Sequence, residues 1–76
     1  MDSIDFHAIL SENRDKNCAL FLKNGEKVNG INRGVSNDDY GCLYARIENR
    51  GTFQLIKHTE VESININDQT LNKNIF

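Results

Sequence analysis

The hydrophobic residues near the start of the chain repeat at helical spacing. Phe6, Ile9 and Leu10 fall at positions i, i+3 and i+4, so they form one apolar stripe. Ser3, just before them, is a residue type that favours the N-cap position of a helix. The pattern predicts a short amphipathic helix from Ile4 to about Arg14. A helix of this length is marginal alone, so its stripe is expected to pack on other structure.

Beyond the helix, the hydrophobic residues lie in short apolar or alternating segments separated by turn signals, which is typical of β structure. Asn24-Gly25 supplies the positive φ angles that a tight hairpin needs, and Asn49-Arg50-Gly51 is a second turn signal. Gly34 to Asp39 is expected to be a loop. The predicted strands are Cys18–Lys23, Lys27–Asn32, Tyr40–Ile47, Thr52–Ile56 and Val61–Ile64.

This order of elements predicts a mainly β fold. One helix followed by five short strands with tight turns describes a small, strongly bent barrel of the SH3, OB or Sm kind. The domain is expected to cover residues 1–64. Polar residues dominate after Ile64, so Asn65 to Phe76 is expected to be a mobile tail.

The length of the chain limits its core. A domain of 76 residues buries only about 60% of the surface that its unfolded chain exposes, so partner subunits are the expected support. Cys18 and Cys42 are too few for a disulfide scaffold and lack zinc-site spacing. No apolar run is long enough to span a bilayer, and the first residues do not resemble a signal peptide. A soluble, cytoplasmic protein with reduced thiols is expected.

The charge and the polar residues exclude some classes of function. The net charge of −2 argues mildly against nucleic acid, but the segment from Arg14 to His58 holds eight basic and five acidic residues. His7 and His58 have no third candidate ligand, so no metal is expected. No nucleophile–base pair, catalytic carboxylate pair or phosphate-binding glycine loop is present. We therefore expect neither an enzyme nor a cofactor.

Several segments resemble the Sm-like RNA chaperones of bacteria, the Hfq family. The hairpin Leu22-Lys23-Asn24-Gly25-Glu26-Lys27-Val28-Asn29-Gly30 is similar to the first Sm motif of that family. Gln54-Leu55-Ile56-Lys57-His58 resembles the second motif, whose hallmark is a Lys-His pair after an apolar strand. Asp38-Asp39-Tyr40 matches the intervening step, and Phe6 to Leu10 lies where the family has its N-terminal helix. The resemblance covers Ser3 to Ile64.

The resemblance implies a function and three sets of binding residues. It implies a homohexameric ring that binds single-stranded RNA and promotes the pairing of small RNAs with messenger RNAs. The proximal face would bind U-rich RNA through Asp39, Tyr40, Lys57 and His58. The distal face would bind A-rich RNA through Phe21, Gly25, Lys27, Val28 and Asn29. A rim site would consist of Arg14 and Lys16.

Each assignment has a purely structural alternative. Lys57 and His58 can instead form a polar turn, and Tyr40 can pack against the barrel edge. Phe21 can belong to the core, and Gly25 can serve the turn alone. Arg14 and Lys16 can close the helix and complement its dipole.

The chain also departs from the family pattern. Ile56 replaces a tyrosine, the end of the helix is less basic, and the segment between the two motifs is longer. The alternative function is a protein-interaction module of the same fold with little or no RNA binding, and a DNA-binding barrel is a third possibility. For assembly, we expect strands Thr52–Ile56 and Val61–Ile64 each to have an unpaired edge that neighbouring subunits pair into a ring.

Overall fold

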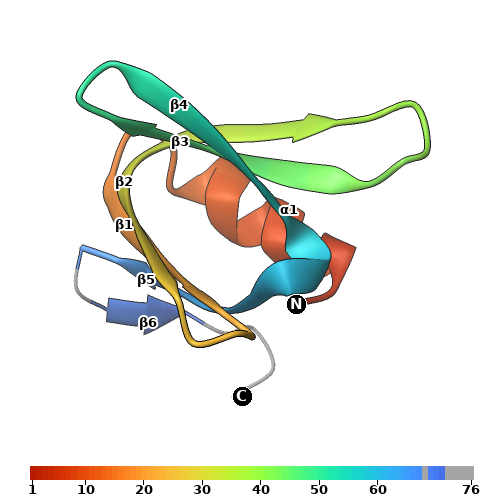
Figure 1. The fold of residues 1–76 in the computed structure, drawn as a ribbon, viewed down its shortest axis with the longest axis horizontal. Helices are drawn as coiled ribbons and strands as arrows, with labels where there is room; N and C mark the ends of the chain where they lie inside the picture. Colours follow the sequence, from red (N-terminus) through yellow and green to blue (C-terminus); the bar gives the residue numbers. More distant parts are fainter. Residues whose placement is uncertain (68, 72–76) are drawn as a thin grey trace.

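The fold is one N-terminal helix packed against one antiparallel β-sheet (Figure 1). The computed structural model describes residues 1–67 and 69–71. The elements in chain order are α1 (Ser3–Glu12), β1 (Asn17–Leu22), β2 (Lys27–Asn37), β3 (Leu43–Asn49), β4 (Thr52–Lys57), the 3₁₀ helix η1 (His58–Glu60), β5 (Val61–Ile66) and β6 (Gln69–Leu71).

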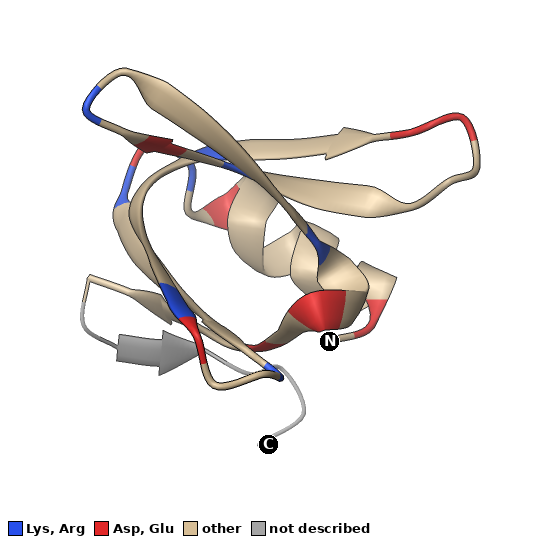
Figure 2. Cartoon of the chain, viewed as in Figure 1, with Lys and Arg blue, Asp and Glu red and all other residues tan. Residues whose placement is uncertain are grey.

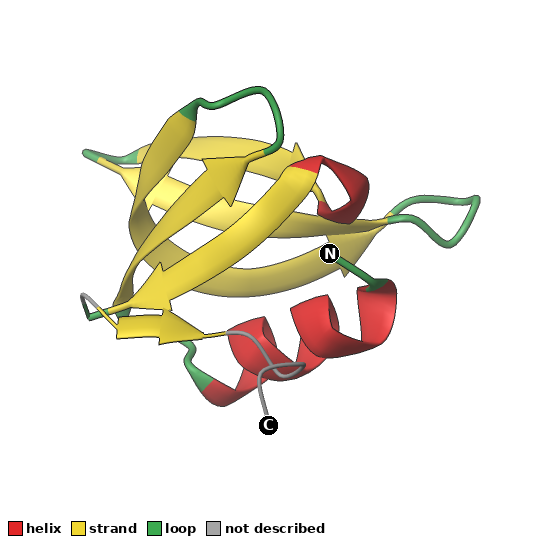
Figure 3. Ribbon diagram, turned by 90° about the horizontal axis from the view of Figure 1, so that it is seen from below, coloured by secondary structure: helices red, strands yellow, loops and turns green. Residues whose placement is uncertain are grey.

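The strands lie in the order β4-β3-β2-β1-β5-β6. The sheet bends around α1, which lies along its inner face (Figure 3). The prediction of a mainly β fold with one helix and five antiparallel strands is confirmed, and a sixth strand, β6, adds to it. Among residues 1–67 and 69–71 the sheet is not closed, because β4 and β6 stand at its two ends without pairing with each other.

The core lies between the helix and the inner face of the sheet. Alternate residues of each strand point to this face, which is why the apolar residues of the strands are spaced by two. The helix contributes the stripe that its spacing predicts. The buried core cluster consists of Phe6, Ile9, Leu10, Cys18, Leu20, Ala45, Ile47, Ile56, Val61, Ile64 and Ile66.

The helix is shorter than its sequence pattern predicts. It begins at Ser3 with Asp2 as its N-cap, whose side chain accepts a hydrogen bond from the Asp5 amide at 2.9 Å, so the prediction of Ser3 as the cap is wrong by one residue. It ends at Glu12 rather than at Arg14. At this end the buried Asn32 donates from Nδ2 to the carbonyls of Leu10 and Asn13, at 2.9 and 2.8 Å. A neutral amide thus satisfies two of the last carbonyls of the helix.

The long strand β2 corrects the prediction of a loop from Gly34 to Asp39. β2 continues to Asn37, and its register with β3 shifts between Asn32 and Val35. Gly34 sits in this irregularity with a φ of +93°, and its amide donates to Oδ1 of Asn32 at 2.9 Å. The irregularity lets the strand bend around the helix. The β2–β3 turn therefore comes later, and β3 begins at Leu43 rather than at Tyr40.

The far end of the sheet corrects the expected assembly edges. β5 continues to Ile66, two residues beyond the expected domain boundary, and β6 pairs with it in the register Ile64↔Leu71 to Ile66↔Gln69. The outer edge of β5 is therefore already paired, so the prediction of an open β5 edge is wrong. Within the described part of the chain, the outer edge of β4 is open as predicted. The rest of the expected tail, residue 68 and residues 72–76, lies outside the described residues.

Candidate nucleic-acid interface

The outer face of the sheet, opposite the helix, carries a polar hollow of about 410 Å³. β1, β2 and the end of β3 form most of its walls, and their register places Asn17 opposite Ile31 and Ala19 opposite both Asn29 and Asn65. Four asparagines from four elements line it together with two cations and one carboxylate. We call it the asparagine pocket, and these residues are Asn17, Asn29, Asn49, Asn65, Lys27, Arg50 and Glu48.

The charged side chains of the asparagine pocket differ in whether an opposite charge compensates them. Glu48 accepts a hydrogen bond from Nε of Arg33 at 2.8 Å, and Nη1 of Arg33 also contacts Asp15 at 2.7 Å. The hydrogen bond to Glu48, followed by that to Asp15, holds the pKa of the Arg33 guanidinium above its usual range. The Glu48 carboxylate is thus compensated, whereas Lys27 and Arg50 are exposed. The pocket therefore favours an anionic ligand.

Two aromatic–cation pairs flank the asparagine pocket on the outer face. Lys27 Nζ lies 5.5 Å from the centre of the Phe21 ring, its partner across β1 and β2. On β3 and β4, Arg46 Cζ lies 5.4 Å from the centre of the Phe53 ring, which is 50% exposed. Such pairs orient both the ring and the cation. A single strand of nucleic acid could stack bases on the rings and place phosphates near the cations.

The structure brings together only part of the predicted distal residues. Phe21, Lys27 and Asn29 share the outer face. Val28 points the other way and packs against the core, since neighbouring strand residues alternate between faces. Gly25 lies in the β1–β2 turn with a φ of +91°, where the turn itself requires a residue that tolerates this angle.

The predicted proximal residues are not assembled into one site. Tyr40 is 91% exposed in the β2–β3 turn, with Asp39 beside it. Among the described residues, no hydrogen bond or ring contact links Tyr40 to Lys57 or His58. Figure 2 shows this turn as the acidic end of the molecule, away from the basic β3–β4 turn. The expected combination of Tyr40 with the Lys-His pair is therefore not formed within one subunit.

Asp38 and Tyr44 lie near Lys57, where the sequence analysis had placed Tyr40. Oδ1 of Asp38 accepts from the amides of Tyr40 and Cys42 at 2.9 and 3.0 Å, and Oδ2 accepts from the Tyr44 hydroxyl at 3.1 Å. Desolvation alone would raise the pKa of Asp38, but these hydrogen bonds and the nearby Lys57 charge lower it below its usual range. The bond to Asp38 raises the pKa of Tyr44.

His58 has a structural role at the start of η1. Its ring centre lies 5.9 Å from that of Phe6, and its Nδ1 lies 3.1 Å from the carbonyl oxygen of Met1. A carbonyl oxygen only accepts, so Nδ1 is the donor in this contact. The ring is half-buried. His58 can therefore offer one nitrogen to a ligand while the other holds the N-terminal segment.

The predicted rim residues lie beyond the helix rather than in its last turn. Lys16 Nζ donates to Asn13 Oδ1 at 3.3 Å, and the Arg14 guanidinium lies beside Gly34. Both side chains are exposed. The last helical turn itself contains no basic residue, and Asn32 satisfies two of the carbonyls at this end.

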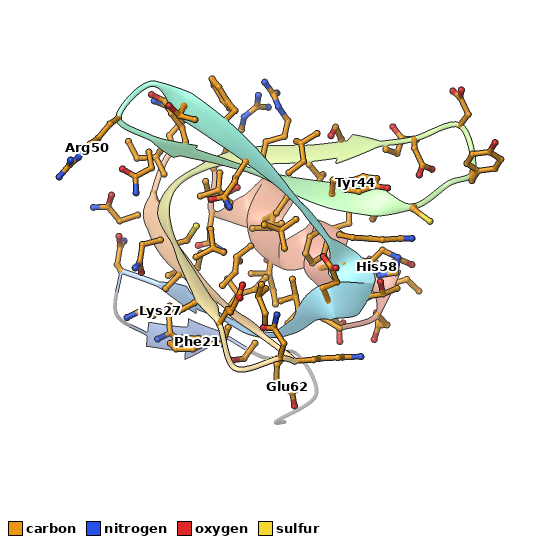
Figure 4. The ribbon with its side chains drawn as sticks, in the orientation of Figure 1. Phe21, Lys27, Tyr44, Arg50, His58 and Glu62 are labelled. Carbon is orange, nitrogen blue, oxygen red and sulfur yellow. The ribbon has the colours of Figure 1, made fainter. Side chains whose placement is uncertain are left out.

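The two candidate surfaces are separated along the sheet, because Tyr44 and Glu48 lie near opposite ends of β3. Figure 4 shows Phe21 and Lys27 on one side with Arg50 above them, and Tyr44 and His58 on the other. The sequence did not single out Asn17 or Asn65, nor the Arg46–Phe53 pair. Asn49 and Arg50 belong to the Asn49-Arg50-Gly51 turn signal, which the sequence alone could place on the surface.

The comparisons with known proteins assign no family. No protein-family model matches this chain, and no curated protein or solved structure matches it at a significant level. Among residues 1–67 and 69–71, no group of three or more histidine, cysteine or acidic residues is placed to hold a metal ion. Within the same residues, no helix combines the length and the apolar character needed to cross a membrane.

Proposed function

We propose that this protein binds single-stranded RNA on the outer face of its sheet and acts as an RNA chaperone. The observation that carries the proposal is the asparagine pocket with an aromatic–cation pair on each side. An asparagine amide offers a donor and an acceptor side by side, which suits the edge of an adenine. The Phe21 and Phe53 rings suit base stacking, which contributes about 1–3 kcal/mol per base.

The arrangement of the elements supports a Sm-like barrel as the framework of this function. The order β4-β3-β2-β1-β5, the helix on the inner face and the short η1 between β4 and β5 agree with the architecture that the sequence resemblance implies. Lys57 and His58 fall at the β4–η1 junction, at the other end of β4 from the β3–β4 turn that borders the asparagine pocket. We propose this junction as a second RNA site, which would take U-rich strands. Two RNAs bound at separate sites of one particle would meet at a raised effective concentration.

Titration of the purified protein with short fluorescent A-rich and U-rich RNAs tests the proposal. Asn29→Ala removes an amide from the asparagine pocket and is expected to weaken A-rich binding about 5- to 100-fold, the range for a bidentate base contact. Asn37→Ala is the matched control, because Asn37 is an exposed asparagine of the same strand that does not line the pocket. It should leave both affinities unchanged.

Lys57→Ala addresses the second site in the same assay. Loss of one phosphate contact per site is expected to weaken U-rich binding and to reduce the salt slope by about one, while A-rich binding stays within error. Equal losses on both RNAs would indicate a general electrostatic effect instead of two sites. If wild-type protein binds neither RNA at low salt, the proposed function is wrong, and a protein-interaction module becomes the better interpretation.

A further inference from the structure

The outer edge of β4 is an unprotected strand edge. β4 and the three-residue β6 stand at the two ends of the sheet, so β4 is its longest open edge among the described residues. It contains no proline, and its ladder with β3 runs from Asn49↔Thr52 to Tyr44↔Lys57 without a register shift. Proteins that remain monomeric usually protect such edges with charges, bulges or proline. Apart from Lys57 at its end, β4 instead carries two of the exposed large apolar side chains of the described residues, Phe53 at 50% and Leu55 at 59%.

The β3–β4 turn determines which peptide groups face this edge. Arg50 and Gly51 form a two-residue turn, both with positive φ, that closes the hairpin at Asn49↔Thr52. Ladder hydrogen bonds alternate along an antiparallel pair, so Thr52 and every second residue after it bond to β3. The amides and carbonyls of Phe53 and Leu55 therefore point outward, available to another strand.

We propose that two copies of this chain pair β4 with β4 across a twofold axis at Gln54, with Phe53 of each copy opposite Leu55 of the other. In an antiparallel pair, side chains that lie opposite each other project from the same face of the sheet. The twofold axis between two β4 strands must therefore pass through one residue rather than between two residues. The register centred on Gln54 pairs both exposed apolar residues with each other and uses both outward peptide groups. The register centred on Leu55 would instead oppose Phe53 to Lys57.

The dimer joins the two sheets into one. An axis through an antiparallel strand pair is perpendicular to the sheet, so the outer faces of both copies point to the same side. Both asparagine pockets then lie on one surface, separated by a stripe of Phe53 and Leu55 side chains from the two copies. The proposed RNA-binding surface would be doubled, although the pairing itself does not depend on RNA. The rival assembly, a ring that pairs β4 with β5 of the next copy, requires β6 to leave the edge of β5.

Cysteine cross-linking without RNA tests the register directly. Gln54→Cys, made with Cys42→Ser, places two thiols opposite each other on the axis, where the Cα atoms of a non-hydrogen-bonded pair are about 4.5 Å apart and within disulfide range. The remaining Cys18 is buried, and burial raises its pKa to about 11, so it does not compete in the oxidation. Thr52→Cys is the matched control, because it faces Ile56 of the other copy and lies far from its own equivalent.

Mild oxidation of the native protein should give a covalent dimer with Gln54→Cys and none with Thr52→Cys. A dimer with Leu55→Cys but not with Gln54→Cys would overturn the proposed register. Absence of cross-linking in all three variants, with circular dichroism like that of wild type, would overturn the pairing.

Sedimentation of protein without introduced cysteines tests the same pairing, even if a cysteine variant fails to fold. Wild type at tens of micromolar should sediment at twice the 8.7 kDa monomer mass. Phe53→Lys should sediment as a monomer, whereas Ile4→Lys, at an apolar residue that is 80% exposed on the helix, should remain a dimer. A ring-sized particle, a wild-type monomer or a dimer insensitive to Phe53→Lys would each overturn the proposal. Because the Phe53 ring also belongs to the proposed RNA surface, RNA affinity is measured on Leu55→Lys instead, which should also sediment as a monomer and keeps both aromatic rings; this measurement tests the proposed function separately.

Discussion

Replacing Asn32 by aspartate would make the stability of this protein depend on pH in an unusual direction. Asn32 is fully buried, and its Nδ2 is the donor to the carbonyls of Leu10 and Asn13 while its Oδ1 accepts from the Gly34 amide. The Asn32→Asp side chain keeps the acceptor and the shape. It replaces the donor with a carboxylate oxygen that faces two carbonyl oxygens at about the same distances.

The cost follows from these contacts. Each buried partner left unsatisfied costs about 1–3 kcal/mol, so two lost hydrogen bonds cost about 2–6 kcal/mol before the burial of a charge is counted. A domain is stable by about 5–15 kcal/mol in total, so the variant should be marginal at neutral pH. Protonation removes the charge and restores one donor. The folded-state pKa of the new carboxyl is therefore raised above its unfolded value of about 3.9.

The raised pKa gives the sign of the effect. The variant should be most stable below pH about 4, and its stability should fall as pH rises through the folded-state pKa of the new group. Urea unfolding of wild type and Asn32→Asp between pH 3 and pH 8 measures this difference. Asn49→Asp is the matched control, since Asn49 is exposed and donates one hydrogen bond, to the Asn29 carbonyl. A difference between wild type and Asn32→Asp that does not change with pH would refute the reasoning.

Two further predictions concern turns. Gly25→Val should destabilise the protein by about 1–2 kcal/mol, the cost of a left-handed angle for a residue with a Cβ, because Gly25 has a φ of +91° and open space around it. A urea midpoint equal to that of wild type would show that the turn tolerates any residue. Asp38→Asn should lower the melting temperature at neutral pH, where the carboxylate that Tyr44 and two amides stabilise is ionised. Because the pKa of Asp38 is lowered, its contribution is lost as pH falls below about 4, so the two melting curves should converge there; curves that stay equally far apart would contradict this account.

The local sequence patterns predicted an element well where a few residues determine the backbone conformation. The spacing of Phe6, Ile9 and Leu10 located the helix, and Asn24-Gly25 located the first hairpin. The length of β2 was not predictable in the same way. A glycine such as Gly34 normally indicates the end of a strand. Here the side chain of Asn32 bonds both the helix end and the Gly34 amide, so β2 bends at this point and continues.

The candidate interface was less predictable, because it depends on the register between strands. Asn17 and Asn65 are far apart in the chain and meet only because β1 pairs with β5. Nothing in the local sequence of either residue indicates this. Phe21, Lys27 and Asn29 were predicted as one surface and share one, since they lie on neighbouring strands of a hairpin whose register the turn determines. Tyr40 was misplaced because the β2–β3 hairpin extends further than expected.

The position of β1 in the sheet has a consequence for the rate and order of folding. β1 through β4 form a continuous series of hairpins, so each of their pairings joins segments that are neighbours in the chain. The pairing of β1 with β5, which brings Cys18 to Ile66, spans most of the chain and closes the largest loop. Contacts of this separation form slowly, because their loop entropy is lost before the contacts can compensate for it. The hairpins should therefore form early, and the arrival of β5 should limit the folding rate.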